Sequence, residues 1–305
     1  MLSDNIKSYL HLHLIVFIWG FTAILGELIS LDALPLVWFR MLMAVGFIVL
    51  FFLYKKQSLA ISKRLFLLFL FLGLVIALHW LTFFKAIKVS NVSVTLACLS
   101  TGAFFTSFLE PIFYKRRVVW YEVLFGLIVV LGLYIIFNFE GDYYLGIILA
   151  LTSAFLSALF SVLNGRLAQK YDSTVISFYE LSGGVLCFSI YLLFTNSFTP
   201  EFFVLKPTDW IFLIILSSVC TAYAFIASVK VMRYLSPYTV MLTINLEPVY
   251  GIILALLIFK EKEQMSTGFY MGAIIIVVTV ILNGFIKFYL KRKNIGKPVK
   301  SISEV

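Results

Sequence analysis

The chain has 305 residues, of which 62% are hydrophobic and only 13% are charged. Soluble domains are typically about 45–50% apolar and about 25% charged, so this composition excludes an ordinary soluble protein and indicates a polytopic membrane protein. The net charge of +9 collects in loops and at the C-terminus, which favours an effect of membrane topology over nucleic-acid binding.

Ten apolar segments are long enough to cross a bilayer as helices, since about 20 residues span its hydrocarbon core. They lack strand-like alternation, so we expect an all-α integral membrane protein rather than a barrel. The connections are too short for a soluble domain, and the first segment has the features of a retained helix rather than a signal peptide. The expected spans are 11–30, 33–54, 65–87, 91–113, 118–138, 143–166, 174–195, 209–231, 237–259 and 267–290.

Lys and Arg are distributed unevenly between the two sides of the membrane that ten spans create. An even number of spans places both termini on one side. Eighteen of the 24 basic residues then fall on that side, five fall on the other, and Arg40 lies within a span. Because basic loops are retained in the cytoplasm, we expect both termini there, with 291–305 as a basic tail. The predicted location is the plasma (cytoplasmic) membrane.

The ten spans divide into two halves of five. A shift of 146 residues superposes the fourth and fifth spans on the ninth and tenth and places Gly102 on Pro248. A shift of 140 places Arg40, in the second span, on Glu180 in the seventh. Five is odd, so the second half enters the membrane in the opposite sense, which predicts an inverted repeat. The predicted repeats are 1–138 and 143–290.

Several short motifs follow one another in a fixed order along these spans. They are Trp19-Gly20, Pro35 with Arg40, the turn at 86–90, and Pro248 followed by Lys260-Glu261, Gly268 and Gly272. This order resembles the EamA family of the drug/metabolite transporter superfamily, from about Leu12 to Leu282. The resemblance implies a ten-helix inverted-repeat transporter of small metabolites, amino acids or toxic compounds, often directed outward. The chain departs from the family pattern at Lys115, where the first repeat usually has glutamate, and at Gly102, where it usually has proline.

The ninth expected span carries polar residues near its middle, among them Asn245 and Glu247. At about 1.5 Å of rise per residue, Glu247 lies about 15 Å beyond Pro237, close to the bilayer centre. A carboxyl group at that depth is costly and usually faces a bundle interior or a water-filled cavity, and Pro248 frees a backbone carbonyl nearby. We therefore interpret Asn245 and Glu247 as substrate-binding candidates. The alternative is that Glu247 is protonated or hydrogen-bonded to a neighbouring span and only holds helices together.

Arg40 and Glu180 lie in opposite halves of the membrane. Their depths differ by about 10 Å along the membrane normal, which is too far for a simple ion pair. We interpret Arg40 as an anion-facing residue on the outer side of a central cavity, Glu180 as its counterpart toward the cytoplasm, and Glu247 as lying between them. The two carboxyl groups are also candidates for proton coupling. Alternatively, Arg40 snorkels to the outer surface or pairs with Glu27.

Aromatic and histidine side chains near these charges complete the predicted site. His79 is either a proton relay or a hydrogen-bonded packing residue. Trp19, Trp38 and Trp80 are the aromatic residues nearest the charged or glycine positions, and we expect them to line an apolar pocket suited to small organic molecules.

The absence of certain motifs narrows the function. There is no phosphate-binding loop, so we expect a secondary transporter that uses alternating access and draws on a gradient, or facilitates passive movement. An intramembrane enzyme acting on a lipid is the alternative, and a passive scaffold is a third class. No HExxH pattern occurs among the three histidines, and the three cysteines lack metal-ligand spacing, so we expect no catalytic residues, metal or cofactor. The expected partners are a small-molecule substrate and the lipid bilayer.

Overall fold

The computed structural model describes residues 4–295 apart from 56–58, 116, 118–119 and 140. Within these ranges all regular secondary structure is helical, which confirms the all-α prediction. The last part of the predicted basic tail, 296–305, lies outside the described residues. The α-helices are α1 (Asp4–Leu28), α2 (Ala33–Lys55), α3 (Lys63–Val89), α4 (Val92–Leu99), α5 (Gly102–Tyr114), α6 (Trp120–Phe139), α7 (Tyr144–Leu167), α8 (Ser173–Phe194), α9 (Pro207–Ser217), α10 (Ala224–Val231), α11 (Pro237–Ile244), α12 (Glu247–Phe259) and α13 (Thr267–Ile295). Short helical turns are η1 (Gly141–Tyr143), η2 (Pro200–Phe203), η3 (Ser218–Tyr223) and η4 (Lys260–Glu263).

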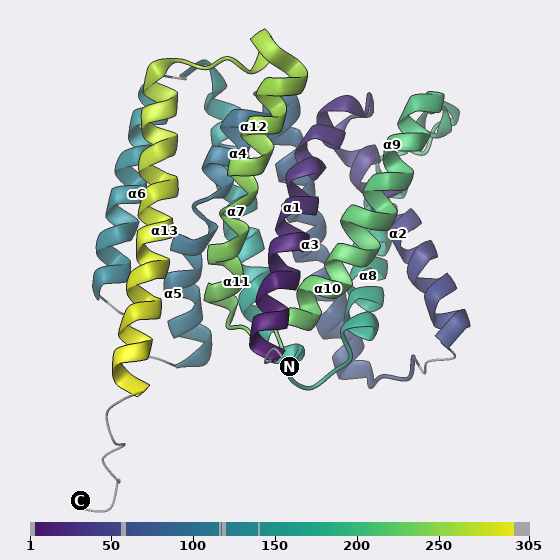
Figure 1. Cartoon of the computed structure of the whole chain (residues 1–305). Coiled ribbons are helices and arrows are strands. Elements are labelled where there is room, and N and C mark those ends of the chain that lie inside the picture. Colours follow the sequence, from purple (N-terminus) through teal and green to yellow (C-terminus); the bar gives the residue numbers. More distant parts are fainter. Residues whose placement is uncertain (1–3, 56–58, 116, 118–119, 140, 296–305) are drawn as a thin grey trace, which may run out of the picture.

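Eight helical segments in the described chain are long and apolar enough to cross a membrane. Two further helices, α6 and α13, contribute the shorter apolar stretches Val123–Asn138 and Thr267–Thr279. The helices run roughly side by side, and α1 begins on the face at which α13 ends (Figure 1). A multi-pass membrane protein follows from this arrangement.

The predicted fourth span, 91–113, corresponds to the candidate membrane span Val92–Tyr114, but its helix is broken, because α4 ends at Leu99 and α5 starts at Gly102. Ser100 and Thr101 lie at the break, and their hydroxyl groups donate to the carbonyl groups of residues three positions earlier. Such local bonds compete with the helical ladder. Hydropathy alone carries no signal for this competition.

The predicted ninth span, 237–259, also divides, into α11 and α12. Pro248 is the second residue of α12. It has no backbone N–H, and its ring excludes the carbonyl group four residues earlier, that of Ile244. The helix therefore ends at Ile244 and restarts at Glu247.

The two broken helices have the same plan. Each has a first part of 8 residues and a second part of 13 residues. The bounds of these four helices are offset by 145 residues, close to the predicted shift of 146. At the offset of 145, Lys115 corresponds to Lys260, and both lysines follow the second part with positive φ, 54° and 49°. In Figure 1 the chain passes from upper α4 to lower α5 but from lower α11 to upper α12, so the two run in opposite directions.

The predicted eighth span, 209–231, contains an irregular turn in its middle. Between α9 and α10 the chain forms the π-helix η3. The Thr221 hydroxyl donates to the carbonyl oxygen of Leu216, five residues earlier, at 2.6 Å. Single π-turns often occur at functional sites because they rotate side chains out of α-helical register.

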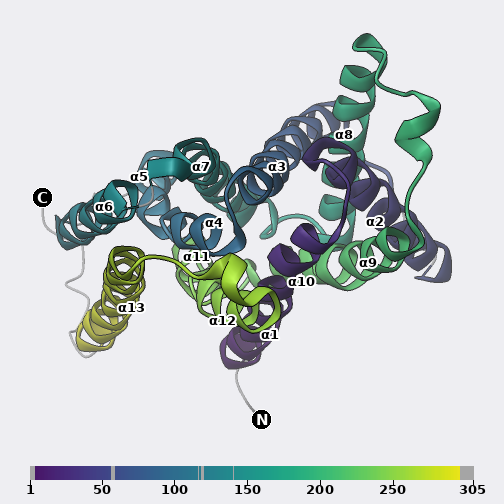
Figure 2. The same cartoon turned by 90° about the horizontal axis from the view of Figure 1, so that it is seen from above.

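Seen from above, the molecule is elongated (Figure 2). The pair formed by α6 and α13 lies at one end, and α2, α8 and α9 lie at the other. A Cβ atom at Gly272 would lie 2.7 Å from the carbonyl oxygen of Gly132, so glycine is what lets α6 and α13 pack this closely. The helices between these two ends, together with α2, surround the central cavity.

Candidate functional site

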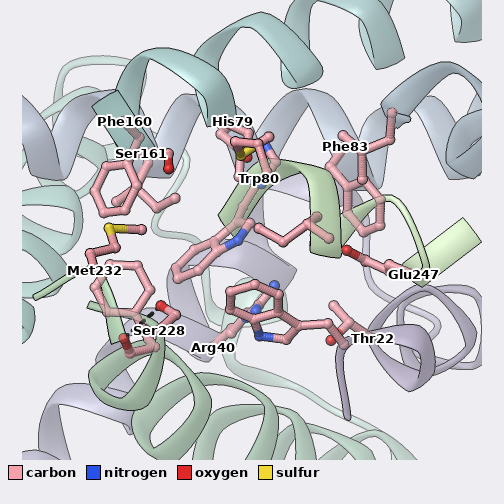
Figure 3. Close-up of a pocket in the computed structure, with 17 residues that line it drawn as sticks. Thr22, Arg40, His79, Trp80, Phe83, Phe160, Ser161, Ser228, Met232 and Glu247 are labelled. Carbon is pink, nitrogen blue, oxygen red and sulfur yellow. Dashed lines mark hydrogen bonds between the residues drawn. The ribbon is translucent and has the colours of Figure 1, made fainter. Parts of the chain in front are cut away.

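A central cavity lies where α1, α2, α3, α7, α10 and the α11–α12 break converge (Figure 3). Its volume is about 70 Å³, room for a few water molecules. Its walls are largely aromatic and aliphatic, with a small number of polar groups, which is the usual make-up of a small-molecule site. The charged and hydrogen-bonding residues of the lining include Thr22, Arg40, His79, Ser161, Ser228 and Glu247.

Arg40 projects into this cavity from α2 and is only 1% exposed. Its Nε donates to the Thr221 Oγ1 at 2.7 Å, and its Cζ lies 4.0 Å from the centroid of the Trp80 ring, a cation–π geometry. Its Nη1 has no hydrogen-bond partner among the described residues. Arg40 is therefore fixed in place with donor capacity left over, and it does not snorkel to the surface.

The π-helix η3 supplies the groups that fix this side of the cavity. It presents the Thr221 hydroxyl to Arg40, and its Cys220 carbonyl oxygen accepts a hydrogen bond from the Trp19 Nε1 at 3.1 Å. One irregular turn thus orients two lining side chains from two other helices.

Glu247 enters the cavity as the first residue of α12 and is 6% exposed. The positive end of the helix dipole favours a carboxylate at this position. The carboxyl group makes no hydrogen bond or ion pair with the described residues, and none of its oxygens lies within 4.0 Å of an Arg40 nitrogen. It extends from the side opposite Ser228 and Met232 (Figure 3). Arg40 and Glu247 therefore line the same cavity without neutralising each other by contact.

His79 both lines the cavity and joins two helices. Its Nδ1 donates to the Ser153 carbonyl oxygen on α7 at 2.9 Å, and the Ser153 hydroxyl donates to the His79 carbonyl oxygen at 3.0 Å. The hydrogen-bonded role is thus present in the structure. The relay role remains a prediction.

Comparison with known protein families shows to which family this chain belongs. The EamA-like transporter family profile matches residues 6–138 and again 144–285. The chain belongs to the EamA-like transporter family. An "uncharacterized transporter" of Archaeoglobus fulgidus is 24% identical over 285 residues, covering 91% of this chain and 97% of that protein. A protein of known crystal structure shares the fold, with a TM-score of 0.68 and 13% identity over 92% of this chain and 98% of that one. The family match and the transporter-named relative identify a membrane transporter and point away from an enzyme.

Three of the residues predicted for the site of this EamA protein do not line the cavity. Trp38 lies two residues before Arg40 and so points to another face of α2, where its Nε1 donates to the Ser189 Oγ at 2.9 Å. Glu180 instead contacts Asn164 on α7. Asn245 directly follows α11, at the helix break, and is 3% exposed. The structure thus brings together Arg40, Glu247, His79, Trp19 and Trp80 from the predicted set.

Several residues that line the EamA cavity are not among those predicted from the sequence. Ser157 and Ser161 on α7 both line it, and Ser153 holds His79 one turn earlier. Their spacing of four residues places all three on one helix face. A polar stripe of this kind within an apolar span can be recognised in the sequence. No sequence pattern indicates that Thr221 belongs to the site, because its orientation depends on the π-turn.

Proposed function

We propose that this EamA-family protein is a secondary transporter of small amphoteric solutes such as amino acids, bound in the central cavity between Arg40 and Glu247. The observation that carries the proposal is that these two opposite charges line one cavity without contacting each other. A guanidinium with a free donor suits a carboxylate, and a carboxylate that has no hydrogen-bond or ion-pair partner in the described part of the chain suits an ammonium group. A zwitterion satisfies both at once.

The aromatic walls suit the apolar part of such a solute. Trp19, Trp80 and Phe83 line the cavity beside the charges. The volume of about 70 Å³ holds only a few waters, so the helices must move apart to admit an amino acid. We assign the structure to a closed state of an alternating-access cycle.

We propose that ten spans form two inverted five-helix repeats, 1–138 and 143–290. The equal 8 and 13 residue parts of the two broken helices, and their opposite directions in Figure 1, support this duplication. In transporters of this kind, broken helices meet near mid-membrane at the substrate site. Both breaks border the cavity here, through Leu99 on one side and Ile244 and Glu247 on the other.

The proposed setting is the cytoplasmic membrane, with both termini in the cytoplasm and transport directed outward. The excess of Lys and Arg on the side of the termini supports the orientation. The outward direction is the one that the EamA resemblance implies. The energy comes from a solute or ion gradient.

The experiment is flux into proteoliposomes with three labelled probes: a zwitterionic amino acid, its decarboxylated amine, and the corresponding acid without the amino group. Arg40→Lys keeps the charge but loses the planar donor fork, and Glu247→Gln loses the negative charge. We expect either change to lower amino-acid flux about tenfold or more, since a hydrogen bond to a charged group contributes about 1.5–3 kcal/mol.

The matched control is Trp38→Phe, which alters a large aromatic residue near Arg40 but outside the cavity. It should leave flux unchanged. Size-exclusion chromatography and thermal unfolding confirm that each variant is folded. Wild-type flux equal to that of protein-free liposomes, or unchanged flux in both charge variants, overturns the proposal.

A further inference from the structure

A second buried polar site lies beside the central cavity, between α7 and α8. Glu180 and Asn164 are both 0% exposed. The Asn164 Nδ2 donates to the Glu180 Oε1 at 3.0 Å. The other oxygen of each group, Asn164 Oδ1 and Glu180 Oε2, has no hydrogen-bond partner among the described residues. Two acceptor atoms of one contacting pair therefore lack a donor.

No basic side chain in the described chain forms an ion pair with Glu180. The helices packed around α8 are α2, α3 and α10, and α7 supplies Asn164. These four helices carry no acidic residue, and two of their basic residues, Arg40 and His79, line the central cavity. A bare carboxylate in this position would be buried without a countercharge, which is strongly unfavourable in a membrane interior. The other basic residues of the four helices lie near helix ends: Lys55, Lys63, Arg64, Lys85, Lys88, Arg166 and Lys230.

We infer that Glu180 and Asn164 form a proton-binding site, in which Glu180 is protonated in the closed state and donates its O–H to Asn164. A carboxylate only accepts hydrogen bonds, whereas a carboxylic acid also has one donor. One proton on Oε2 neutralises the buried charge and supplies the donor that Asn164 Oδ1 lacks. The amide and the acid then form two parallel hydrogen bonds, N–H to Oε1 and O–H to Oδ1.

Two further buried hydroxyl groups, one on α7 and one on α8, lie next to this pair and have no hydrogen-bond partner among the described residues. Ser161 lies one turn from Asn164 on α7, lines the central cavity and has no partner for its Oγ among the described residues. Ser177 lies one turn from Glu180 toward the start of α8, and its Oγ likewise has none. Both residues are buried. The polar atoms thus extend from the cavity, past the pair, toward the loop between α7 and α8.

This site rests on the proposed transport function and assigns its coupling ion as a proton. When the proton leaves, the O–H bond of Glu180 breaks, the proton passes to water, and a carboxylate remains. That carboxylate keeps one hydrogen bond from Asn164 and needs water for its other oxygen. Deprotonation therefore requires water to enter between α7 and α8, which links the proton to opening of the closed state.

Glu180→Gln tests the inference, because glutamine copies the neutral acid in shape and its N–H can donate to Asn164, but it cannot release a proton. We expect the variant to fold, to bind the amino acid and to exchange it across the liposome membrane. Uptake driven by a pH gradient should fall to the level of protein-free liposomes. Substrate-driven pH change inside the liposomes, read by a trapped dye, should also disappear. Glu201→Gln, which removes an exposed carboxyl group, is the matched control and should retain both signals.

An infrared measurement tests protonation without any transport. The wild-type minus Glu180→Gln difference spectrum at neutral pH should contain the C=O stretch of a protonated carboxylic acid. Absence of that band overturns the inference. Amino-acid transport that moves no protons in the wild type, or proton movement that persists in Glu180→Gln, also overturns it while leaving the proposed transport function intact. Failure of all amino-acid flux in the presence of the infrared band refutes the transport function and leaves the proton site standing.

Discussion

The anchor of Arg40 can be tested by Thr221→Val, which keeps the shape of the side chain and removes its hydroxyl group. In the structure this hydroxyl accepts from the Arg40 Nε at 2.7 Å and donates to the Leu216 carbonyl oxygen at 2.6 Å. The guanidinium is 1% exposed and its Nη1 already lacks a partner among the described residues. The substitution therefore leaves a second nitrogen of a buried cation without an acceptor.

The expected cost follows from that geometry. A hydrogen bond to a charged group contributes about 1.5–3 kcal/mol to stability, and leaving a buried donor without an acceptor removes that contribution in full. We expect the free energy of unfolding of Thr221→Val to fall by about 2 kcal/mol. Thr106→Val is the matched control, since Thr106 is also buried and, among the described residues, its hydroxyl donates only to the Gly102 carbonyl oxygen of its own helix, at 2.9 Å. Loss of such a local bond should cost less than about 1 kcal/mol.

The assay is the folded fraction of each variant in mixed micelles as the mole fraction of SDS increases, followed by tryptophan fluorescence. Thr221→Val should unfold at a clearly lower SDS fraction than Thr106→Val, and it should also bind the amino acid more weakly because Arg40 loses its orientation. Equal unfolding of the two variants would refute the idea that the π-helix holds Arg40 in the cavity.

Two further predictions concern the scaffold around the site. Gly73→Ala should destabilise the fold by more than about 1 kcal/mol, because its Cβ would meet backbone atoms of α8. Gly46→Ala has open space at its Cβ and should be neutral or stabilise the fold by up to about 1 kcal/mol. Equal effects of the two substitutions in thermal unfolding would contradict this packing. Glu263→Gln should lower the free energy of unfolding by about 1 kcal/mol, since its carboxylate accepts from two N–H groups at the start of α4, at 3.0 and 2.9 Å. A loss no larger than that of the exposed Glu201→Gln in the same SDS titration would show that the carboxylate does not stabilise α4.

Hydropathy and the cost of buried charge predict much of this molecule. The helical class follows from apolar runs that satisfy their own backbone groups, and the membrane cost of a charged side chain is enough to single out Arg40 and Glu247 in the sequence. Both line the central cavity. The family resemblance, carried by short motifs, is confirmed by a profile match along nearly the whole chain.

The remaining features depend on local hydrogen bonds and on side-chain direction, neither of which can be predicted from composition. The break between α4 and α5 arises from two hydroxyl groups that bond to nearby carbonyls, and within the π-helix the Thr221 hydroxyl donates to the Leu216 carbonyl oxygen five residues earlier, which no sequence pattern indicates. Trp38 was expected in the site because it is close to Arg40 in sequence, but two residues along a helix turn the side chain to another face. Proximity in sequence is a poor guide to a shared cavity.

The most direct test of the central claim, that the cavity beside Arg40 is the transport site, is the chemical accessibility of Ser157→Cys. Ser157 lines the cavity, and the variant is made in a chain whose three native cysteines, Cys98, Cys187 and Cys220, are replaced. A membrane-impermeant maleimide is added to right-side-out or inside-out vesicles with and without the transported amino acid. Modification from both sides, slowed by the amino acid, is the predicted result. The account would be contradicted by a cysteine that reacts from neither side. It would also be contradicted if an amino acid that the protein transports left the rate of maleimide modification unchanged.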